Sequence, residues 1–192
     1  MDIILASQSP RRQEILAKLG LPFQVAPSEY EEDMTMDLPP VELVKTLAQG
    51  KAQDVSERYT EALVIGSDTI VVYQDTKLGK PRSVEEAQDM LRMLQGQKNQ
   101  IITGVCIRQA SSGTEIVFAD TVDILMTPMS EEQIISYVAS GEPMDKAGAY
   151  ALQEKGAVFI ERMEGDFFTA MGLPLRRVAE SLEELGLSIW EK

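Results

Sequence analysis

Asp68 is the residue of this sequence whose surroundings most favour chemistry. It lies between two apolar stretches, residues 62–65 and 70–72, and its immediate neighbours include Gly66, Ser67 and Thr69. This pattern predicts two strand segments with a break between them, and the carboxylate of Asp68 lies at that break. Such a carboxylate can accept a proton or ligate a metal ion. The alternative is that Asp68 only closes a turn by accepting hydrogen bonds from nearby backbone.

Two arginines lie where a helix is expected to begin. Arg11 and Arg12 directly follow Ser9, a good N-cap residue, and Pro10, which suits the first helical position. The N-terminus of a helix attracts anions, so cations there are a local misfit that a bound polyphosphate would relieve. Ser7 in the preceding loop belongs to the same candidate anion site. The alternative is a pair of solvated surface arginines.

Other charged residues extend this candidate site. Lys80 stands between a glycine and a proline, which suits a fixed ammonium that contacts phosphate, and Lys51 on a predicted helix is a second candidate. Glu31 and Glu32 offer further oxygen ligands for a metal. A solvated surface position is the alternative for each of them. The Gly-x4-Gly-Lys-Ser/Thr spacing of a P-loop is absent.

The composition excludes several kinds of site. The chain has no histidine and one cysteine, which removes Ser-His-Asp triads, histidine-ligated zinc sites and internal disulfides. Any metal must therefore be held by oxygen atoms, which favours Mg²⁺ or Mn²⁺ and a phosphorylated substrate. The net charge of -13 opposes binding to polymeric nucleic acid. Cys106 lies in an apolar run and is expected to be a buried strand thiol.

The elements that must position these residues alternate between strands and helices. No apolar run approaches the roughly 20 residues of a membrane span, and no signal peptide is evident, so a cytoplasmic protein without membrane contact is expected. A mixed sheet in one α/β domain over residues 1–192 is predicted. Strands are expected at 3–6, 23–25, 62–72 with the break, 100–109, 115–126 and 157–163, and helices at 10–19, 40–55, 84–94, 131–139 and 175–185.

Six ordered blocks lie along the whole chain: residues 5–12 (LASQSPRR), 66–69 (GSDT), 79–81 (GKP), 103–105 (TGV), 145–150 (DKAGAY) with Gln153, and 172–175 (GLPL). Together these blocks resemble the Maf family. Its members were once described as septum-formation inhibitors and are now regarded as nucleoside triphosphate pyrophosphatases.

The resemblance implies a fold and a set of roles. The fold is a two-lobed mixed α/β sheet with flanking helices, similar to inosine triphosphate pyrophosphatases, with the active-site cleft between the lobes, and the protein is expected to form homodimers. Asp68 resembles the catalytic proton acceptor and, with Glu32, the metal-binding pair. The residues that resemble polyphosphate contacts are Ser7, Arg12, Lys51 and Lys80.

The resemblance also implies a substrate preference. Arg11, Thr69 and Gln153 match the branch that acts on dTTP and UTP, and the amide of Gln153 offers a donor and an acceptor to the edge of uracil or thymine. The chain departs from the common pattern at Glu31, at Asn99, where a histidine is frequent, and at residues 169–171.

Two other functions remain open at this point. A regulatory module that binds nucleotides and influences cell division would need the basic residues but no metal-positioned carboxylate. A housekeeping enzyme for modified pyrimidine nucleotides would share the whole site. In the hydrolytic hypothesis water attacks the α-phosphorus, and Asp68 acts as the base or chiefly as a metal ligand.

Overall fold

The computed structural model describes residues 1–190, and their contacts divide the chain into two compact units. Unit 1 comprises Met1–Asp68, Thr103–Asp120 and Phe167–Lys192, and unit 2 comprises Thr69–Ile102 and Thr121–Asp166. The prediction of one domain over residues 1–192 stays a prediction. Each unit is described by itself below.

Within residues 1–190 the strands form one seven-stranded sheet in the order β2-β1-β3-β5-β6-β7, with β4 also pairing with β3. β1 pairs in parallel with β2 and β3, whereas β3 with β4 and β6 with β7 are antiparallel. The predicted mixed α/β fold is therefore confirmed. The strands are β1 (Ile3–Leu5), β2 (Gln24–Val25), β3 (Leu63–Tyr73), β4 (Thr76–Leu78), β5 (Lys98–Gln109), β6 (Thr114–Met126) and β7 (Ile160–Glu164).

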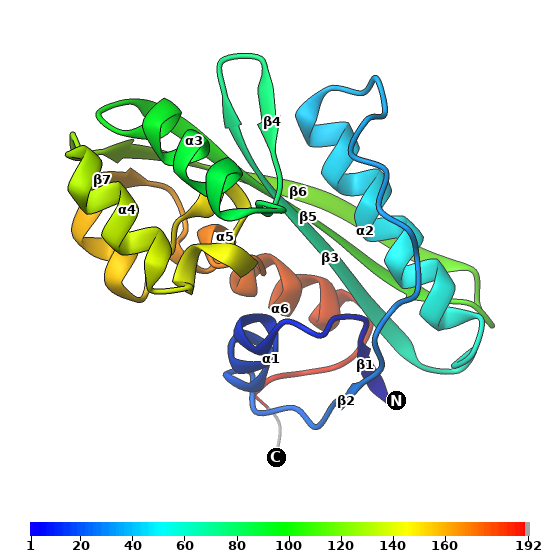
Figure 1. Ribbon diagram of the computed structural model, residues 1–192. Helices are drawn as coiled ribbons and strands as arrows, with labels where there is room; N and C mark the ends of the chain where they lie inside the picture. Colours follow the sequence, from blue (N-terminus) through cyan, green and yellow to red (C-terminus); the bar gives the residue numbers. More distant parts are fainter. Residues whose placement is uncertain (191–192) are drawn as a thin grey trace. The chain divides into compact units, whose positions relative to one another are not determined.

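The core of unit 1 follows the two-residue period of its strands. Ile3 and Leu5 of β1 pack in a cluster that includes buried residues of the helices α1 (Pro10–Ala17) and α6 (Leu175–Glu184). Ile4 and Ala6 point to the other side and pack with α2 (Pro40–Ser56). Figure 1 shows α2 along one face of these strands and α1 and α6 on the opposite face. Alternate apolar residues thus bury both faces of this part of the sheet.

Cys106 of β5 belongs to the cluster on the α2 side and is buried. Burial raises the pKa of its thiol to about 12, so the group stays protonated and unreactive near neutral pH. The prediction of a buried strand thiol is confirmed.

Helix α2 approaches the sheet closely because two strand residues opposite it are glycines. A β-carbon added at Gly66 would lie 2.4 Å from the carbonyl oxygen of Ala48, and one at Gly104 would lie 2.4 Å from that of Val44. No real β-carbon tolerates such a contact with backbone. These two glycines therefore set the distance between α2 and the strands, and α2 carries Lys51.

Gly104→Ala is expected to lower the free energy of unfolding by about 2–3 kcal/mol, because the new methyl group must push α2 away from β5. Urea denaturation measures this change. Gly113→Ala is the matched control: its φ is +70° but nothing lies within 4 Å of the added carbon, so about 1 kcal/mol is expected. A smaller loss at Gly104 than at Gly113 would contradict the close approach.

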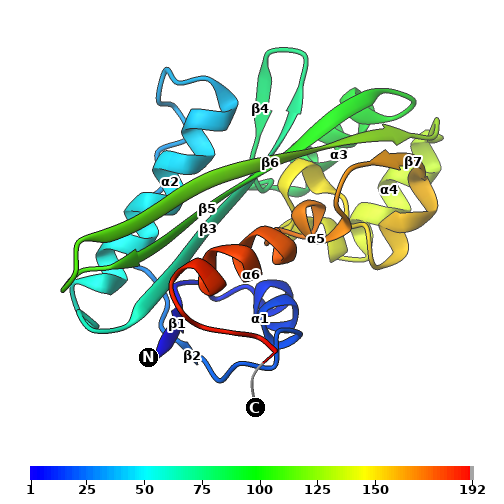
Figure 2. The same cartoon turned by 180° about the vertical axis from the view of Figure 1, so that it is seen from behind.

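Two helices of unit 2 begin at the capping residues that the sequence predicts. The hydroxyl of Ser83 accepts from the Glu86 amide at the start of α3 (Val84–Leu94), and Ser130 and Gln133 form a complete capping box at the start of α4 (Glu131–Ala139). Both views show α3 next to α4 (Figures 1 and 2), and the two helices are in contact. The short helices that follow are η1 (Glu142–Asp145), η2 (Ala147–Ala149) and η3 (Lys155–Phe159).

Two predicted boundaries are wrong. The break around Asp68 does not exist, because β3 runs without interruption from Leu63 to Tyr73. Gly66 fits against α2, and the buried hydroxyl of Ser67 reaches the carbonyl oxygens of Gly104 and Gly172, each at 2.9 Å, so the strand accommodates both residues. The strand predicted at 157–163 starts only at Ile160, after η3.

A short helix, α5 (Phe167–Ala170), was not predicted. In the described residues no helix combines the length and the apolar character that crossing a membrane requires.

Candidate active site

A buried lysine and two carboxylates form the centre of the candidate site in unit 1. Lys51 of α2 places its Nζ 2.5 Å from Oδ1 of Asp68 on β3 and 2.7 Å from Oε1 of Glu32. The same Nζ lies 3.4 Å from the carbonyl oxygen of Ser67. Asp68 is 5% exposed and Lys51 is 8% exposed, whereas Glu32 is exposed. One ammonium therefore joins a buried carboxylate to an exposed one.

Helix α2 aims Lys51 at the strand through its small residues. Ala48 and Ala52, one turn apart, lie against Gly66, so this face of the helix sits directly on β3. Lys51 is adjacent to that face and reaches the Asp68 carboxylate, two residues beyond Gly66 on the same side of the strand.

Arg12 is fixed by α1 and by a distant loop. Its Nε donates to the carbonyl oxygen of Gly172 at 2.8 Å, and its Nη1 donates to Oγ of Ser7 at 3.4 Å. Ser7 Oγ also accepts from the Ser9 amide at 3.2 Å, while the side chain of Ser9 makes no capping bond. The guanidinium predicted to bind phosphate is thus held in a defined orientation beside a serine predicted for the same role.

The charges of this cluster act on one another. Burial lowers the pKa of Arg12, and the negative charges of Asp68 and Glu32 oppose that change. Burial likewise raises the pKa of Asp68 above its usual range, against the opposing effects of Lys51 and Arg12. A carboxylate with a raised pKa is a better proton acceptor than a solvated one.

The carboxylates present fit a hard divalent cation. Among residues 1–190 no group of three or more Asp, Glu, His or Cys side chains could hold a metal ion. Mg²⁺ needs no such cage, because it is commonly held by one or two carboxylates together with substrate phosphates and water. Glu32 and Asp68, which share the ammonium of Lys51, are two carboxylates of this number, and their role as metal ligands stays a prediction.

The predicted site residues are distributed over both units. Unit 1 brings together five of them, Ser7, Arg12, Glu32, Lys51 and Asp68. Arg11 lies half-buried in the first turn of α1. Unit 2 carries the other three: Thr69 is half-buried on β3, Lys80 is exposed after β4, and Gln153 is exposed between η2 and η3. The roles assigned to these residues stay predictions.

Sequence reasoning missed the buried hydrogen bonds that join the strands of the site to the segment around Gly172. Ser67 contacts the carbonyl oxygens of Gly104 and Gly172, and the hydroxyl of Thr103 donates to the carbonyl oxygen of Thr169 at 2.8 Å. The carbonyl oxygen of Gly172 therefore accepts hydrogen bonds from both Arg12 and Ser67. A serine inside an apolar strand and a threonine beside a strand glycine were the available signals, but they did not reveal partners that lie between 37 and 105 residues away.

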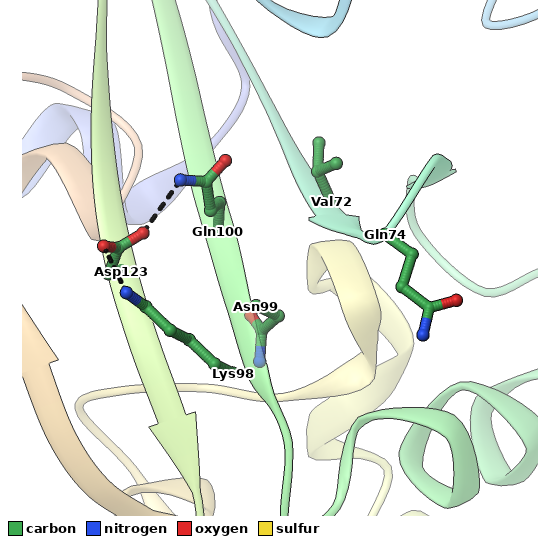
Figure 3. Close-up of a pocket in the computed structure, with 6 residues that line it drawn as sticks. All are labelled: Val72, Gln74, Lys98, Asn99, Gln100 and Asp123. Carbon is green, nitrogen blue, oxygen red and sulfur yellow. Dashed lines mark hydrogen bonds and ion pairs between the residues drawn. The ribbon is translucent and has the colours of Figure 1, made fainter.

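A separate hollow of about 270 Å³ lies in unit 2 (Figure 3). Lys98 and Gln100 both reach the carboxylate of Asp123 there, at 2.9 and 2.8 Å. Asn99, at the position where a histidine is frequent, accepts from the Tyr150 hydroxyl at 2.8 Å, and its Nδ2 has no hydrogen-bond partner in the described chain. None of the predicted site residues lines this hollow, whose walls are Val72, Gln74, Lys98, Asn99, Gln100 and Asp123.

Comparison with known proteins gives consistent matches over nearly the whole chain. Residues 2–185 match the family described as Maf, Maf-like protein. A protein of Methanosarcina mazei named dTTP/UTP pyrophosphatase is 48% identical over 191 residues, which cover 99% of this chain and 97% of that protein. A protein of the same name from Methanosarcina barkeri is 47% identical over 192 residues, which cover 100% of this chain and 98% of that protein.

The solved structures give a more distant likeness. The structure of the Staphylococcus aureus Ham1 protein aligns with a TM-score of 0.51 at 16% identity and covers 97% of each chain. At this identity the likeness concerns the fold alone, and it agrees with the mixed α/β sheet described above.

Proposed function

This chain belongs to the Maf family, and from that premise we propose that it hydrolyses nucleoside triphosphates to the monophosphate and pyrophosphate, with dTTP and UTP as preferred substrates. The observation that carries the proposal is the buried Asp68 carboxylate held by Lys51, with Arg12 close enough to affect its pKa. The names of the relatives from both Methanosarcina species support the choice of substrates.

In the proposed reaction a water molecule attacks the α-phosphorus and the bond to the bridging oxygen breaks, so pyrophosphate leaves. Asp68, whose buried carboxylate contacts Lys51, accepts the proton of the attacking water. The negative charge of the phosphates is met by Arg12 and Lys51, together with the hydroxyl of Ser7, all of unit 1. Positioning and charge neutralisation supply most of the rate enhancement in such phosphoryl transfers.

Glu32 and Asp68 are the residues that would hold a divalent cation, Mg²⁺ or Mn²⁺. When bound, such a cation supplies further neutralisation of phosphate charge and lowers the pKa of water. Lys51 orients both carboxylates in the protein itself, since one ammonium contacts each of them.

Base selection is assigned to Arg11, Thr69 and Gln153. Uracil and thymine share an edge with one N–H donor flanked by carbonyl acceptors, and the amide of Gln153 can match both kinds of group. Cytosine presents the opposite order at two of these positions, so a donor would meet a donor and an acceptor would meet an acceptor there. The protein is further proposed to act in the cytoplasm as a homodimer.

The test is release of pyrophosphate from a panel of canonical and modified nucleoside triphosphates. We expect kcat/KM for dTTP and UTP to exceed that for dCTP and dGTP by about 100-fold or more, and activity to disappear with chelator and return with Mg²⁺ or Mn²⁺. A guanine substrate at the top of the panel would refute the assigned preference. Binding without turnover of any member would favour the regulatory module, and highest activity on a modified pyrimidine would favour the housekeeping enzyme.

A further inference from the structure

The carboxylate of Glu142 lies at the centre of a hydrogen-bonded cluster in unit 2. Its Oε1 accepts from the hydroxyl of Tyr137 and from the Gly156 amide, each at 2.9 Å, and its Oε2 accepts from the Lys155 amide at 3.0 Å. One side chain thus satisfies two successive backbone donors at the start of η3. A charged acceptor makes such bonds stronger than neutral ones.

Tyr137 connects this carboxylate to a second point of the chain. Its oxygen accepts a hydrogen bond from the Ala151 amide at 3.1 Å, and its hydroxyl group donates a hydrogen bond to Glu142. Tyr137 is 5% exposed, and its ring packs against Phe159 at a centroid distance of 5.4 Å. Burial raises the pKa of this hydroxyl, so it keeps the proton that the bond to Glu142 requires.

Gln153 lies on the segment between these fixed points. The Ala151 amide is held on one side of it and the Lys155 and Gly156 amides are held on the other. Gln153 is exposed, whereas Tyr137 is buried. Tyr150, three residues before Gln153, is also buried and donates a hydrogen bond to Asn99. The loop that presents Gln153 is therefore fixed from the interior at both of its ends.

We propose that Tyr137 and Glu142 are positioning residues that hold Gln153 in register with the edge of the base, and thereby set the preference for uracil and thymine over cytosine. This inference rests on the proposed function and on the role of Gln153 in it. An amide distinguishes donor from acceptor only when its position is fixed, and a misplacement of about 1 Å can cost as much as 100-fold in rate. Neither residue needs to touch the substrate.

Tyr137→Phe tests the proposal because it removes the hydroxyl and leaves the ring packed against Phe159. We expect the ratio of kcat/KM for dTTP to that for dCTP to fall by about 10-fold, mainly through a higher KM for dTTP with kcat nearly retained, as expected when binding to the base is lost. Glu142→Gln is expected to act in the same direction, since a single amide oxygen replaces a carboxylate that serves three donors. Tyr73→Phe is the matched control in unit 2, where the hydroxyl accepts a hydrogen bond from the neighbouring Gln74 and is remote in sequence from the Gln153 loop.

A double-mutant cycle with Gln153→Ala separates positioning from a general structural effect. If Tyr137 acts through Gln153, Tyr137→Phe causes no further loss of the dTTP to dCTP ratio in the Gln153→Ala background. Additive losses in the double variant, or an unchanged ratio in either Tyr137→Phe or Gln153→Ala alone, overturn the inference. Absence of pyrophosphate release by the unaltered protein would instead refute the proposed function. Thermal unfolding verifies that each variant is folded, and Glu142→Gln replaces Tyr137→Phe in the cycle if the latter is not.

Discussion

Asp68→Asn is expected to lower kcat/KM for dTTP by about 1,000-fold or more while the protein remains folded. The amide has the shape of the carboxylate and can still accept from Lys51, so the packing of β3 against α2 is preserved. It cannot accept a proton from water near neutral pH and it is a poor metal ligand. Loss of a positioned general base alone costs about 100-fold to 10,000-fold. Pyrophosphate release at saturating Mg²⁺ measures the change.

The matched control for this substitution is Asp120→Asn. Asp120 also lies in unit 1, but its carboxylate is paired with Arg177 and takes no part in the cluster around Lys51. Activity within a factor of about two of the unaltered protein is expected there. If Asp68→Asn kept activity within ten-fold of that control, the assignment of Asp68 would be wrong, whichever of its two roles was intended.

Local chemistry made much of the fold predictable. Helices α3 and α4 begin where expected because Ser83 and Ser130 cap the backbone within three residues of themselves. The apolar residues of β5 and β6 likewise identified two long strands. These signals depend on neighbours in sequence, so they can be recognised without knowledge of the tertiary structure.

The continuity of β3 depended on contacts between distant segments. Gly66 and Ser67 favour irregular backbone by their local preferences. In the folded protein the glycine makes room for α2, and the serine hydroxyl is satisfied by the carbonyl oxygens of Gly104 and Gly172. Tertiary packing therefore overrides the local preference, and the partners lie 37 and 105 residues away.

The residues of the site could be identified from sequence, but their pairing could not. Their charge and their places in the predicted elements selected Lys51, Asp68 and Glu32 as candidates, and the resemblance to a known family suggested their roles. The ammonium of Lys51 contacts both carboxylates because α2 packs directly on β3, and this packing is visible only in the tertiary structure. The bond from Arg12 to Gly172 spans 160 residues and had no local signal.

Lys51→Met is expected to lower the free energy of unfolding by about 3 kcal/mol near neutral pH, measured by urea denaturation with chelator present. The substitution keeps the length and apolar stem of the side chain but leaves the Asp68 carboxylate buried without its ammonium. Removing one partner of a buried ion pair is costly because the remaining charge is not compensated. Arg12 compensates part of that charge, since it already opposes the rise in the pKa of Asp68.

The loss should depend on pH in a defined direction. Without Lys51 the pKa of Asp68 in the folded protein rises further above the value of about 3.9 expected in the unfolded chain. The folded variant then binds a proton more tightly than the unfolded one, so its stability falls as pH rises through the raised pKa and recovers as pH is lowered. The difference from the unaltered protein is therefore largest at neutral pH and shrinks toward acid.

Lys45→Met on the same helix separates this effect from the loss of any lysine. Lys45 pairs with the exposed Glu42 at 3.0 Å, an interaction that water screens. A change of no more than about 0.5 kcal/mol, independent of pH, is expected for that variant. Equal losses in the two variants, or a loss in Lys51→Met that does not diminish toward acid, would mean that Lys51 does not stabilise a buried Asp68 charge. If both expectations hold, Lys51 offsets part of the cost of burying the Asp68 charge in unit 1.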